Sequence, residues 1–254
     1  MNRLLMIIIL LIVCFTATAA VYMNNINTVN TSTLNLQNKI ETYIVKFSEA
    51  TLSTVSHYAY LFNIKEEFFD DELYFVFKNE EEQLTVYKHL NQINYKRLQT
   101  KEEPLQELGA ITVNNDEDAV NTAVNFLKKN RLQFSYEESL VGFDGEFYKV
   151  TLINKLSGIA MLAFNNTVIL DKRGNVVNVD YFYAEFSKHG SCELLSLRDA
   201  CERSGVFFTD EVLENAEVSI IYMYADSIIV PGYLIEGQLQ DGSCFRKIVN
   251  AACF

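Results

Sequence analysis

The sequence predicts an α+β protein, with a single N-terminal transmembrane helix followed by an extracytoplasmic region of helix-plus-antiparallel-sheet units. Three observations support this prediction. Residues 4–23 carry no charge, helical spacing of apolar residues alternates with short aromatic and β-branched runs, and turn sequences containing Gly separate several of those runs. The 254 residues are 49% hydrophobic and carry a net charge of -12, as expected of a folded, acidic protein.

The N-terminal segment is long enough to cross a membrane. About twenty residues at about 1.5 Å rise each span a hydrocarbon core of roughly 30 Å. Arg3 precedes the segment and the next charge is Lys39, so the positive-inside rule places the N-terminus in the cytoplasm. We therefore expect a single-pass protein of the cell membrane. Its anchor residues would include Leu4, Leu5, Ile7, Ile8, Leu11, Ile12, Phe15 and Tyr22.

A cleaved secretory signal is the alternative interpretation of this segment. Arg3 supplies its basic start, and Ala17-Thr18-Ala19 resembles a cleavage site. The apolar run continues past that site to Met23, and Tyr22 suits a membrane interface, which favours a retained anchor. Both interpretations place the residues after about 25 outside the cytoplasm.

The whole chain divides into predicted segments by composition and periodicity. Residues 1–25 form the cytoplasmic start and anchor, and residues 26–110 form a juxtamembrane helix with a small α+β region. In that region we expect a helix over residues 36–62, a strand over 72–78 and a second helix over 82–98.

Residues 111–190 and 191–254 are two predicted units that share one order, a helix and then antiparallel strands. In the first unit Asp116 caps a helix that ends near Asn130. Strands over 146–152, 163–170 and 176–186 follow it. In the second unit a helix over 197–204 ends at Gly205, and strands follow over 218–224, 233–239 and 244–250.

Four cysteines lie in the last quarter of the chain, and an even number in an exported region allows two disulfides with three connectivities. Buried free thiols are the alternative. The short Cys-x2-Cys or Cys-x4-Cys spacing of a zinc site is absent, so we expect no metal. The cysteines concerned are Cys192, Cys201, Cys244 and Cys253.

Composition and motifs disfavour several function classes. A pI near 4.8 without a Lys/Arg cluster disfavours nucleic acid and anionic membrane surfaces as partners. No nucleophile elbow, phosphate loop, His-Glu-x-x-His or dinucleotide fingerprint occurs. We therefore expect no enzyme, no cofactor and no small-molecule substrate.

Several short stretches carry a family resemblance that covers roughly residues 110–254 and the anchor. The stretches are Asp118-Ala119-Val120, Phe147-Tyr148-Lys149-Val150, Pro231-Gly232-Tyr233-Leu234-Ile235, Asp241-Gly242 and Val249-Asn250-Ala251. With the anchor, they resemble the YycI and YycH regulators of the WalK (YycG) sensor kinase of Gram-positive bacteria, and the single units are similar to PepSY-type domains. The chain departs from that pattern where Pro231-Gly232-Tyr233 replaces the family's Pro-Ala-Trp, and no tryptophan occurs anywhere.

The resemblance implies a protein that acts by contact and has no enzymatic activity. The expected function is that of a membrane-anchored extracytoplasmic regulator, which modulates a two-component sensor kinase, or another membrane protein, in signal transduction. The alternative is a secreted or anchored PepSY-like binding or inhibitor module, which holds a peptide along a sheet edge or masks a protease.

Overall fold

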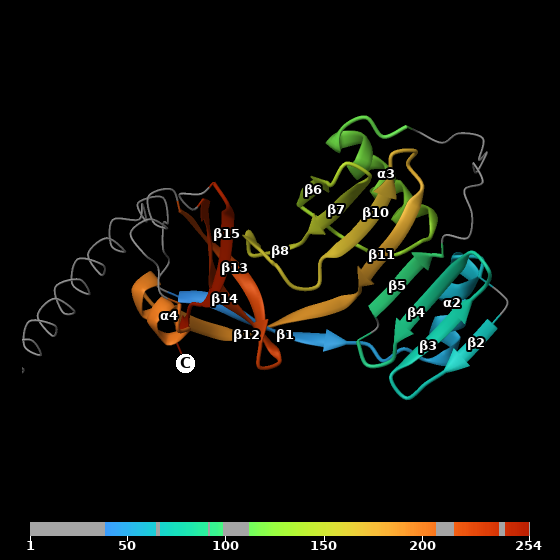
Figure 1. Cartoon of the computed structure of the whole chain (residues 1–254). Coiled ribbons are helices and arrows are strands. Elements are labelled where there is room, and N and C mark those ends of the chain that lie inside the picture. The colour runs from blue at the N-terminus through green and yellow to red at the C-terminus, as the bar shows by residue number, and fades with distance from the viewer. Residues whose placement is uncertain are drawn as a thin grey trace, which may run out of the picture. The chain divides into compact units, whose positions relative to one another are not determined.

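The computed structural model describes residues 39–64, 67–90, 92–98, 112–206, 216–238 and 242–253. The chain forms two compact units: unit 1 takes residues up to 44 and from 188 onward, and unit 2 takes residues 45–187 (Figure 1). The predicted anchor residues lie outside the described ranges. Within those ranges, no helix combines the length and the apolar character that a membrane span requires.

Unit 2 consists of two halves that repeat one order, a helix followed by antiparallel strands. In the first half the elements are α2 (Leu52–Leu61), β2 (Glu67–Asp70), β3 (Tyr74–Lys78), β4 (Glu82–Tyr87) and β5 (Gln92–Arg97). In the second half they are α3 (Asp116–Lys129), β6 (Glu138–Phe143), β7 (Phe147–Ile153), β10 (Asn166–Asp171) and β11 (Val176–Phe182).

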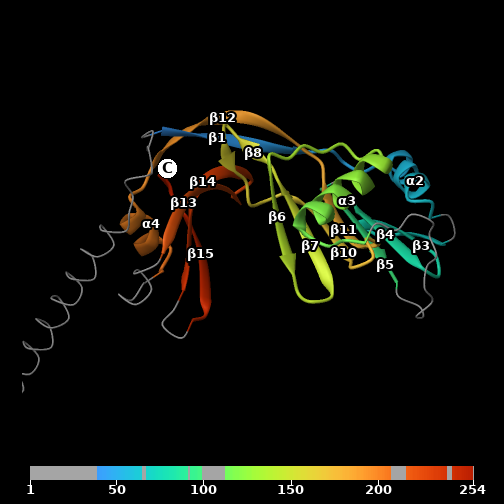
Figure 2. The same ribbon diagram turned by 90° about the horizontal axis from the view of Figure 1, so that it is seen from above.

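The last strands of the two halves pair with each other and join them into one sheet. β5 and β11 are antiparallel, with Tyr95 opposite Val179. The strand order is therefore β2-β3-β4-β5-β11-β10-β7-β6, and the first strand of each half forms an edge. Both helices lie on the same face of this sheet (Figures 1 and 2), and a single apolar core joins them to it.

The core of unit 2 draws on both halves. Leu84 and Ile93 from the first half and Leu127 and Val150 from the second are fully buried. Burial of side chains of this size contributes roughly 1.5–3 kcal/mol each. The halves therefore stabilise each other, which explains why they form one unit although they are separate in sequence.

Unit 1 has its own sheet and a short helix. Its helix α4 (Leu197–Arg203) packs on the sheet through buried Ala200 and Cys201, which contact a cluster that includes Tyr233 and Val249. The strand order is β13-β14-β1-β12-β16, with β15 also paired to β14. The bounds are β1 (Lys39–Phe47), β12 (Ala184–Leu194), β13 (Glu217–Ala225), β14 (Ile228–Gln238), β15 (Cys244–Asn250) and β16 (Ala252–Cys253).

All three described helices begin with the same kind of cap. The side chain of the N-cap residue accepts a hydrogen bond from the backbone N–H three positions later, which satisfies one of the helix's unpaired donors. The N-cap residues are Thr51, Asn115 and Ser196, and the donors are Thr54, Asp118 and Asp199.

The same helices also end alike. A residue in the left-handed region follows the last turn, and the next N–H bonds back to a carbonyl five residues earlier, as in a Schellman motif. The left-handed residues are Asn63 (φ 57°), Arg131 (φ 52°) and Gly205 (φ 64°). The bonds run from Ile64 to Ala59 (2.9 Å), from Leu132 to Leu127 (3.0 Å) and from Val206 to Cys201 (3.0 Å).

The predicted α+β class is confirmed, and so are the helices that start at 116 and 197, although Asn115 rather than Asp116 is the cap. The helix predicted over 82–98 is wrong, because β4 and β5 form a hairpin there. Leu84 and Val86, and then Ile93 and Tyr95, are buried at a period of two, which is the period of a strand.

The helix predicted over residues 36–62 is also wrong in part. Its described residues begin with strand β1, and only α2 is helical. The strand predicted over 176–186 is divided between β11 and β12, and β6 was not predicted. Unit 2 spans the predicted boundary between residues 110 and 111, because the β5–β11 pairing joins strands from both sides of it.

Candidate functional site

The two halves of unit 2 differ most at one connection. β3 and β4 are joined by residues 79–81, whereas residues 154–165 lie between the corresponding strands β7 and β10. This longer connection carries the small hairpin of β8 (Lys155–Leu156) and β9 (Ile159–Ala160). Insertions in one copy of a repeated unit often build binding sites. A pocket of about 310 Å³ lies beside this insertion.

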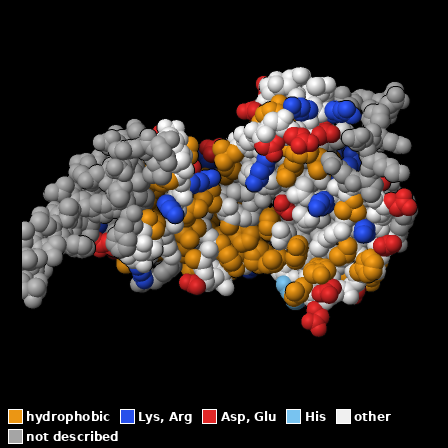
Figure 3. Space-filling view, viewed as in Figure 1, with side chains coloured by type: hydrophobic (Ala, Val, Ile, Leu, Met, Phe, Trp, Pro, Cys, Tyr) orange, Lys and Arg blue, Asp and Glu red, His pale blue; other side chains and the backbone are white. Residues whose placement is uncertain are grey.

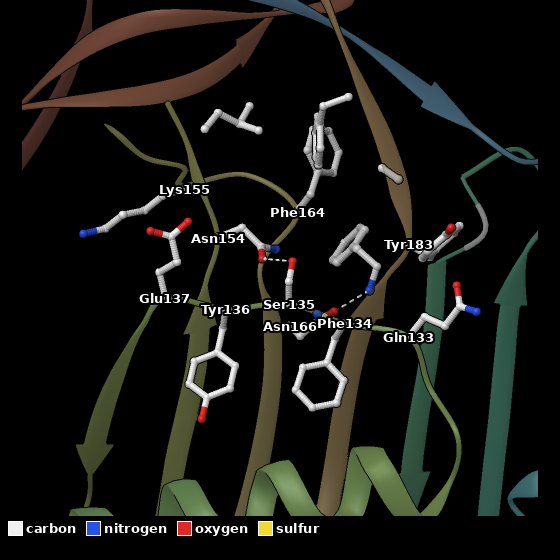
Figure 4. A pocket seen from close by; sticks show the side chains of 14 residues that line it. Gln133, Phe134, Ser135, Tyr136, Glu137, Asn154, Lys155, Phe164, Asn166 and Tyr183 are labelled. Carbon is white, nitrogen blue, oxygen red and sulfur yellow. Dashed lines mark hydrogen bonds between the residues drawn. The ribbon is translucent and has the colours of Figure 1, made fainter. Parts of the chain in front are cut away.

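Four stretches of unit 2 line the pocket: residues 133–137 after α3, the insertion, the start of β10, and residues 182–186 (Figure 4). Aromatic rings dominate one part of the lining. The ring of Phe164 lies 5.8 Å from that of Phe182 and 6.4 Å from that of Phe186. Phe164 has φ 59°, a left-handed conformation that is unfavourable for a bulky residue, and strained conformations of this kind cluster at functional sites.

Amide side chains hold the insertion against the loop after α3. Ser135 Oγ donates to Asn154 Oδ1 at 3.1 Å, a bond visible in Figure 4. The backbone N–H of Asn154 donates to Asn165 Oδ1 at 3.2 Å, and Asn165 Nδ2 donates to the Met161 carbonyl at 2.6 Å. The pocket wall is therefore fixed by bonds within unit 2.

Asn166 is the most buried polar side chain of the lining, with 1% of its surface exposed. Its Oδ1 accepts a hydrogen bond from the Phe182 backbone N–H at 2.8 Å. Its Nδ2 has no hydrogen-bond partner among the described residues. A buried amide donor without a partner is uncommon and calls for an explanation.

Tyr181 supports the same wall from the core side. Its ring is 2% exposed, and its hydroxyl donates to the Gln133 carbonyl at 2.8 Å. Burial raises the pKa of Tyr181 above its ordinary value near 10, so the hydroxyl stays protonated and able to donate into the alkaline range.

Strand β6 follows directly in the chain on the pocket-lining residues 133–137, and it forms one edge of the eight-stranded sheet. Within the described part of the chain it pairs only with β7. The β6–β7 turn is fixed by Asp144, whose carboxylate accepts from the N–H groups of Phe147 (2.8 Å) and Glu146 (2.9 Å). These bonds lower the pKa of Asp144.

The turn sets which β6 amides point outward. The N–H of Asp144 donates to Phe147, so residue 144 forms a hydrogen-bonded pair with β7. Antiparallel pairs alternate along a ladder, so the backbone groups of Ser139, Val141 and Phe143 point away from β7. They form an edge that can accept another strand.

The two sheet edges are protected differently. β2 has four residues, with Glu67 and Asp70 at its ends, and such short, charged strands discourage pairing with another chain. β6 has six residues, and its one charged residue, Glu138, is paired with Lys155 of β8. Leu140 is 52% exposed on the outer face. Within the part of the chain that the structure describes, β6 therefore lacks the usual protection of an edge.

Phe143 is half-exposed at the far end of the strand. Its ring stacks on Tyr148 at 4.5 Å between centroids, and the Lys172 ammonium lies 5.3 Å from it. On the face of unit 2 seen in Figure 3, Lys and Arg side chains are scattered among acidic and apolar ones. β6 thus offers apolar contacts at two positions along its length.

The four predicted cysteines are free thiols in the structure. Cys192 and Cys201 are buried, and burial raises the pKa of both thiols, that of Cys201 to about 11. Cys244 and Cys253 are exposed. Cys253 lies opposite Glu193 in the β12–β16 ladder, so the adjacent Cys192 points to the other face of the sheet. Among the described residues, no cluster of His, Cys, Asp or Glu could hold a metal ion.

Sequence reasoning located neither the pocket nor the β6 edge. A signal for the pocket was present in the spacing of the predicted strands, since residues 153–162 separate two of them without a predicted element. Asn166 itself gives no sequence signal, because Asn is frequent in this chain and only the fold buries this one.

No family model and no curated protein matches this chain. Solved structures that partly superpose on this chain include an uncharacterized protein from Eubacterium rectale ATCC 33656, at TM-score 0.48 and 10% identity, covering 85% of each chain. Another is the YpeB C-terminal domain of Bacillus megaterium, at TM-score 0.36 and 16% identity, covering 90% of this chain and 92% of that one. Both TM-scores are below 0.5, so the description of this fold rests on its own elements.

Proposed function

We propose that this protein is a non-catalytic binding module that takes up an extended polypeptide segment as an additional strand on β6. The observation that carries the proposal is the unprotected β6 edge beside the pocket. Strand addition of this kind uses main-chain hydrogen bonds for affinity and alternate side chains for specificity.

The outward-facing positions of β6 supply the hydrogen bonds. Ser139, Val141 and Phe143 each present one N–H and one carbonyl, and a net contribution of about 0.5–1.5 kcal/mol per bond is typical. Leu140 adds an apolar contact on the outer face. A partner strand with an apolar residue opposite Leu140 and no like charge opposite Glu138 would fit best.

The proposed partner is an extracytoplasmic segment of a membrane protein, with a sensor kinase as the first candidate. Two sequence features support this choice, namely the expected anchor and the resemblance to the YycI and YycH regulators and PepSY-type domains. A module that prefers one conformation of the kinase would shift its active population by that difference in affinity. A secreted partner, such as a protease masked by the same edge, is the alternative.

The test combines photocrosslinking with a change to one backbone amide. The full-length protein carries benzoyl-phenylalanine in place of Leu140 in its own host, and crosslinked peptides are identified by mass spectrometry. Ser139→Pro removes one outward N–H and should leave the β6–β7 ladder intact, because residue 139 does not donate to β7. Ser139→Ala is the matched control.

We expect crosslinks to one extended segment of a membrane protein, retained in the Ser139→Ala background and lost in the Ser139→Pro background. Far-UV circular dichroism and thermal melting establish that both variants are folded. Unchanged crosslinking in folded Ser139→Pro protein would overturn strand addition on β6. Crosslinks to a secreted protein would replace the kinase with the alternative partner.

A further inference from the structure

We infer that the pocket beside β8 and β9 is a subsite for one apolar residue of the bound segment, whose main-chain carbonyl accepts a hydrogen bond from Asn166 Nδ2. This inference rests on the proposed function, because it assigns a subsite to the segment that pairs with β6. The ligand class is a neutral acyl or peptide group attached to an aromatic or branched aliphatic side chain.

The first argument is the unused donor. Asn166 is 1% exposed and lies in the pocket lining, where its Oδ1 is already bonded to the Phe182 N–H. Its Nδ2 finds no acceptor among the described residues, and leaving such a donor buried is unfavourable. A ligand carbonyl in the pocket would satisfy it.

The second argument is the apolar surface around that donor. The lining rings of Phe134, Phe182 and Phe186 can contact an apolar side chain. A volume of about 310 Å³ lies at the small end of the range for ligand pockets. This size suits a single side chain with its peptide group and is small for a large cofactor.

The third argument is charge, which separates a carbonyl from a carboxylate. Glu137 and Lys155 both line the pocket, and the Lys155 ammonium is already paired with Glu138. A free carboxylate would therefore meet the charge of Glu137, and the cation of the lining, Lys155, would have to be shared with Glu138. A neutral carbonyl avoids this repulsion, so the subsite favours an internal residue over a chain terminus.

The pocket and the strand edge are continuous in the chain. Glu137 lines the pocket, and β6 starts at the next residue, Glu138. A segment paired with β6 that continues beyond Glu138 therefore runs toward the end of the sheet at which the pocket lies.

The test uses N-acetyl-L-phenylalaninamide, a neutral probe with the required ring and carbonyls, and N-acetyl-L-phenylalanine as its charged match. Binding to the full-length protein in nanodiscs is followed by saturation-transfer NMR. For a ligand of this size we expect a Kd on the order of 1 mM for the neutral probe. We expect the charged probe to bind at least about five-fold more weakly.

Two variants locate the probe. Asn166→Asp keeps an acceptor for the Phe182 N–H and removes the amide donor, so the neutral probe should bind about five-fold more weakly. Ala184→Trp fills the pocket from its lining and should abolish binding, even if Asn166→Asp fails to fold. Asn114→Asp, at an exposed position that does not line the pocket, should bind as the wild type does.

The outcomes separate this inference from the proposed function. Equal binding of both probes, or unchanged binding by folded Asn166→Asp and Ala184→Trp, would overturn the subsite. If these results occur while Ser139→Pro still abolishes crosslinking at Leu140, strand addition on β6 stands without the subsite. If the neutral probe binds as expected while Ser139→Pro leaves crosslinking unchanged, the pocket stands and β6 pairing falls.

Discussion

Tyr181→Phe should change the stability of unit 2 in opposite directions at neutral and at alkaline pH. The substitution removes the hydroxyl that donates to the Gln133 carbonyl and leaves the buried ring in place. Gln133 is an exposed residue, so we expect water to replace the lost donor at its carbonyl. The expected cost at pH 8 is therefore about 1 kcal/mol of unfolding free energy.

The sign of the stability difference between Tyr181→Phe and the wild type reverses at alkaline pH, because the folded state disfavours the ionised phenol. Burial is the main reason that the pKa of Tyr181 is raised in the folded state, whereas the unfolded chain ionises near pH 10. Below pH 10 the phenol is protonated in both states, so its ionisation does not change the free energy of unfolding. Above pH 10 the unfolded state loses a proton that the folded state keeps. The wild type then loses up to about 1.4 kcal/mol per pH unit through this residue.

The two effects should cancel between about pH 10.5 and 11, where the loss through ionisation reaches about 1 kcal/mol. Urea unfolding at pH 8, 10 and 11 measures this, with hydrogen exchange of peptides from α3 as the probe, because two units need not unfold together. Tyr60→Phe, at a ring 71% exposed, is the control and should stay within about 0.5 kcal/mol of wild type. A Tyr181→Phe difference that is constant across this pH range would refute the reasoning.

Three further predictions concern other parts of the chain. Arg131→Gly should stabilise unit 2 by about 0.5–1 kcal/mol, because glycine adopts the left-handed conformation of residue 131 without strain. Gly205→Ala should destabilise unit 1 by about 1 kcal/mol, because alanine is strained in that conformation. Urea unfolding measures both changes, and a change of the same sign in the two variants would contradict the explanation. Iodoacetamide at pH 8 should label exposed Cys244 and Cys253 well before buried Cys201, as measured by peptide mass spectrometry. Labelling of Cys244 and Cys253 only after reduction would instead establish disulfides. The intact mass of the protein from membrane and culture fractions of its host should be that of the full chain in the membrane, and a shortened form in the medium would show a cleaved signal.

Local signals in the sequence were enough to predict several elements. The α3 helix was predictable because its start and end signals surround a clear apolar stripe, and buried Ala119, Ala123 and Leu127 belong to that stripe. The turn at Asp171 to Asn175 was predictable from its residue types. Each of these features depends on residues that are close together in the chain.

Local reasoning was insufficient where two patterns compete. Residues 82–97 contain enough apolar positions to fit a helix, and only the pairing of β4 with β5, and of β5 with β11, selects strands. The relation between the halves of unit 2 was missed for the same reason, since it depends on the antiparallel contact of Tyr95 with Val179.

The sequence by itself determined the α+β class, the end of the second unit's helix at Gly205 and the expectation of an exported, anchored, acidic protein, because composition and short-range patterns carry that information. Only the tertiary structure decided that β6 is an edge and that Asn166 is buried, with no acceptor for its Nδ2 among the described residues. Edge position and burial arise from contacts between residues far apart in the chain. For that reason, the site proposed here became visible only after the sheet was assembled.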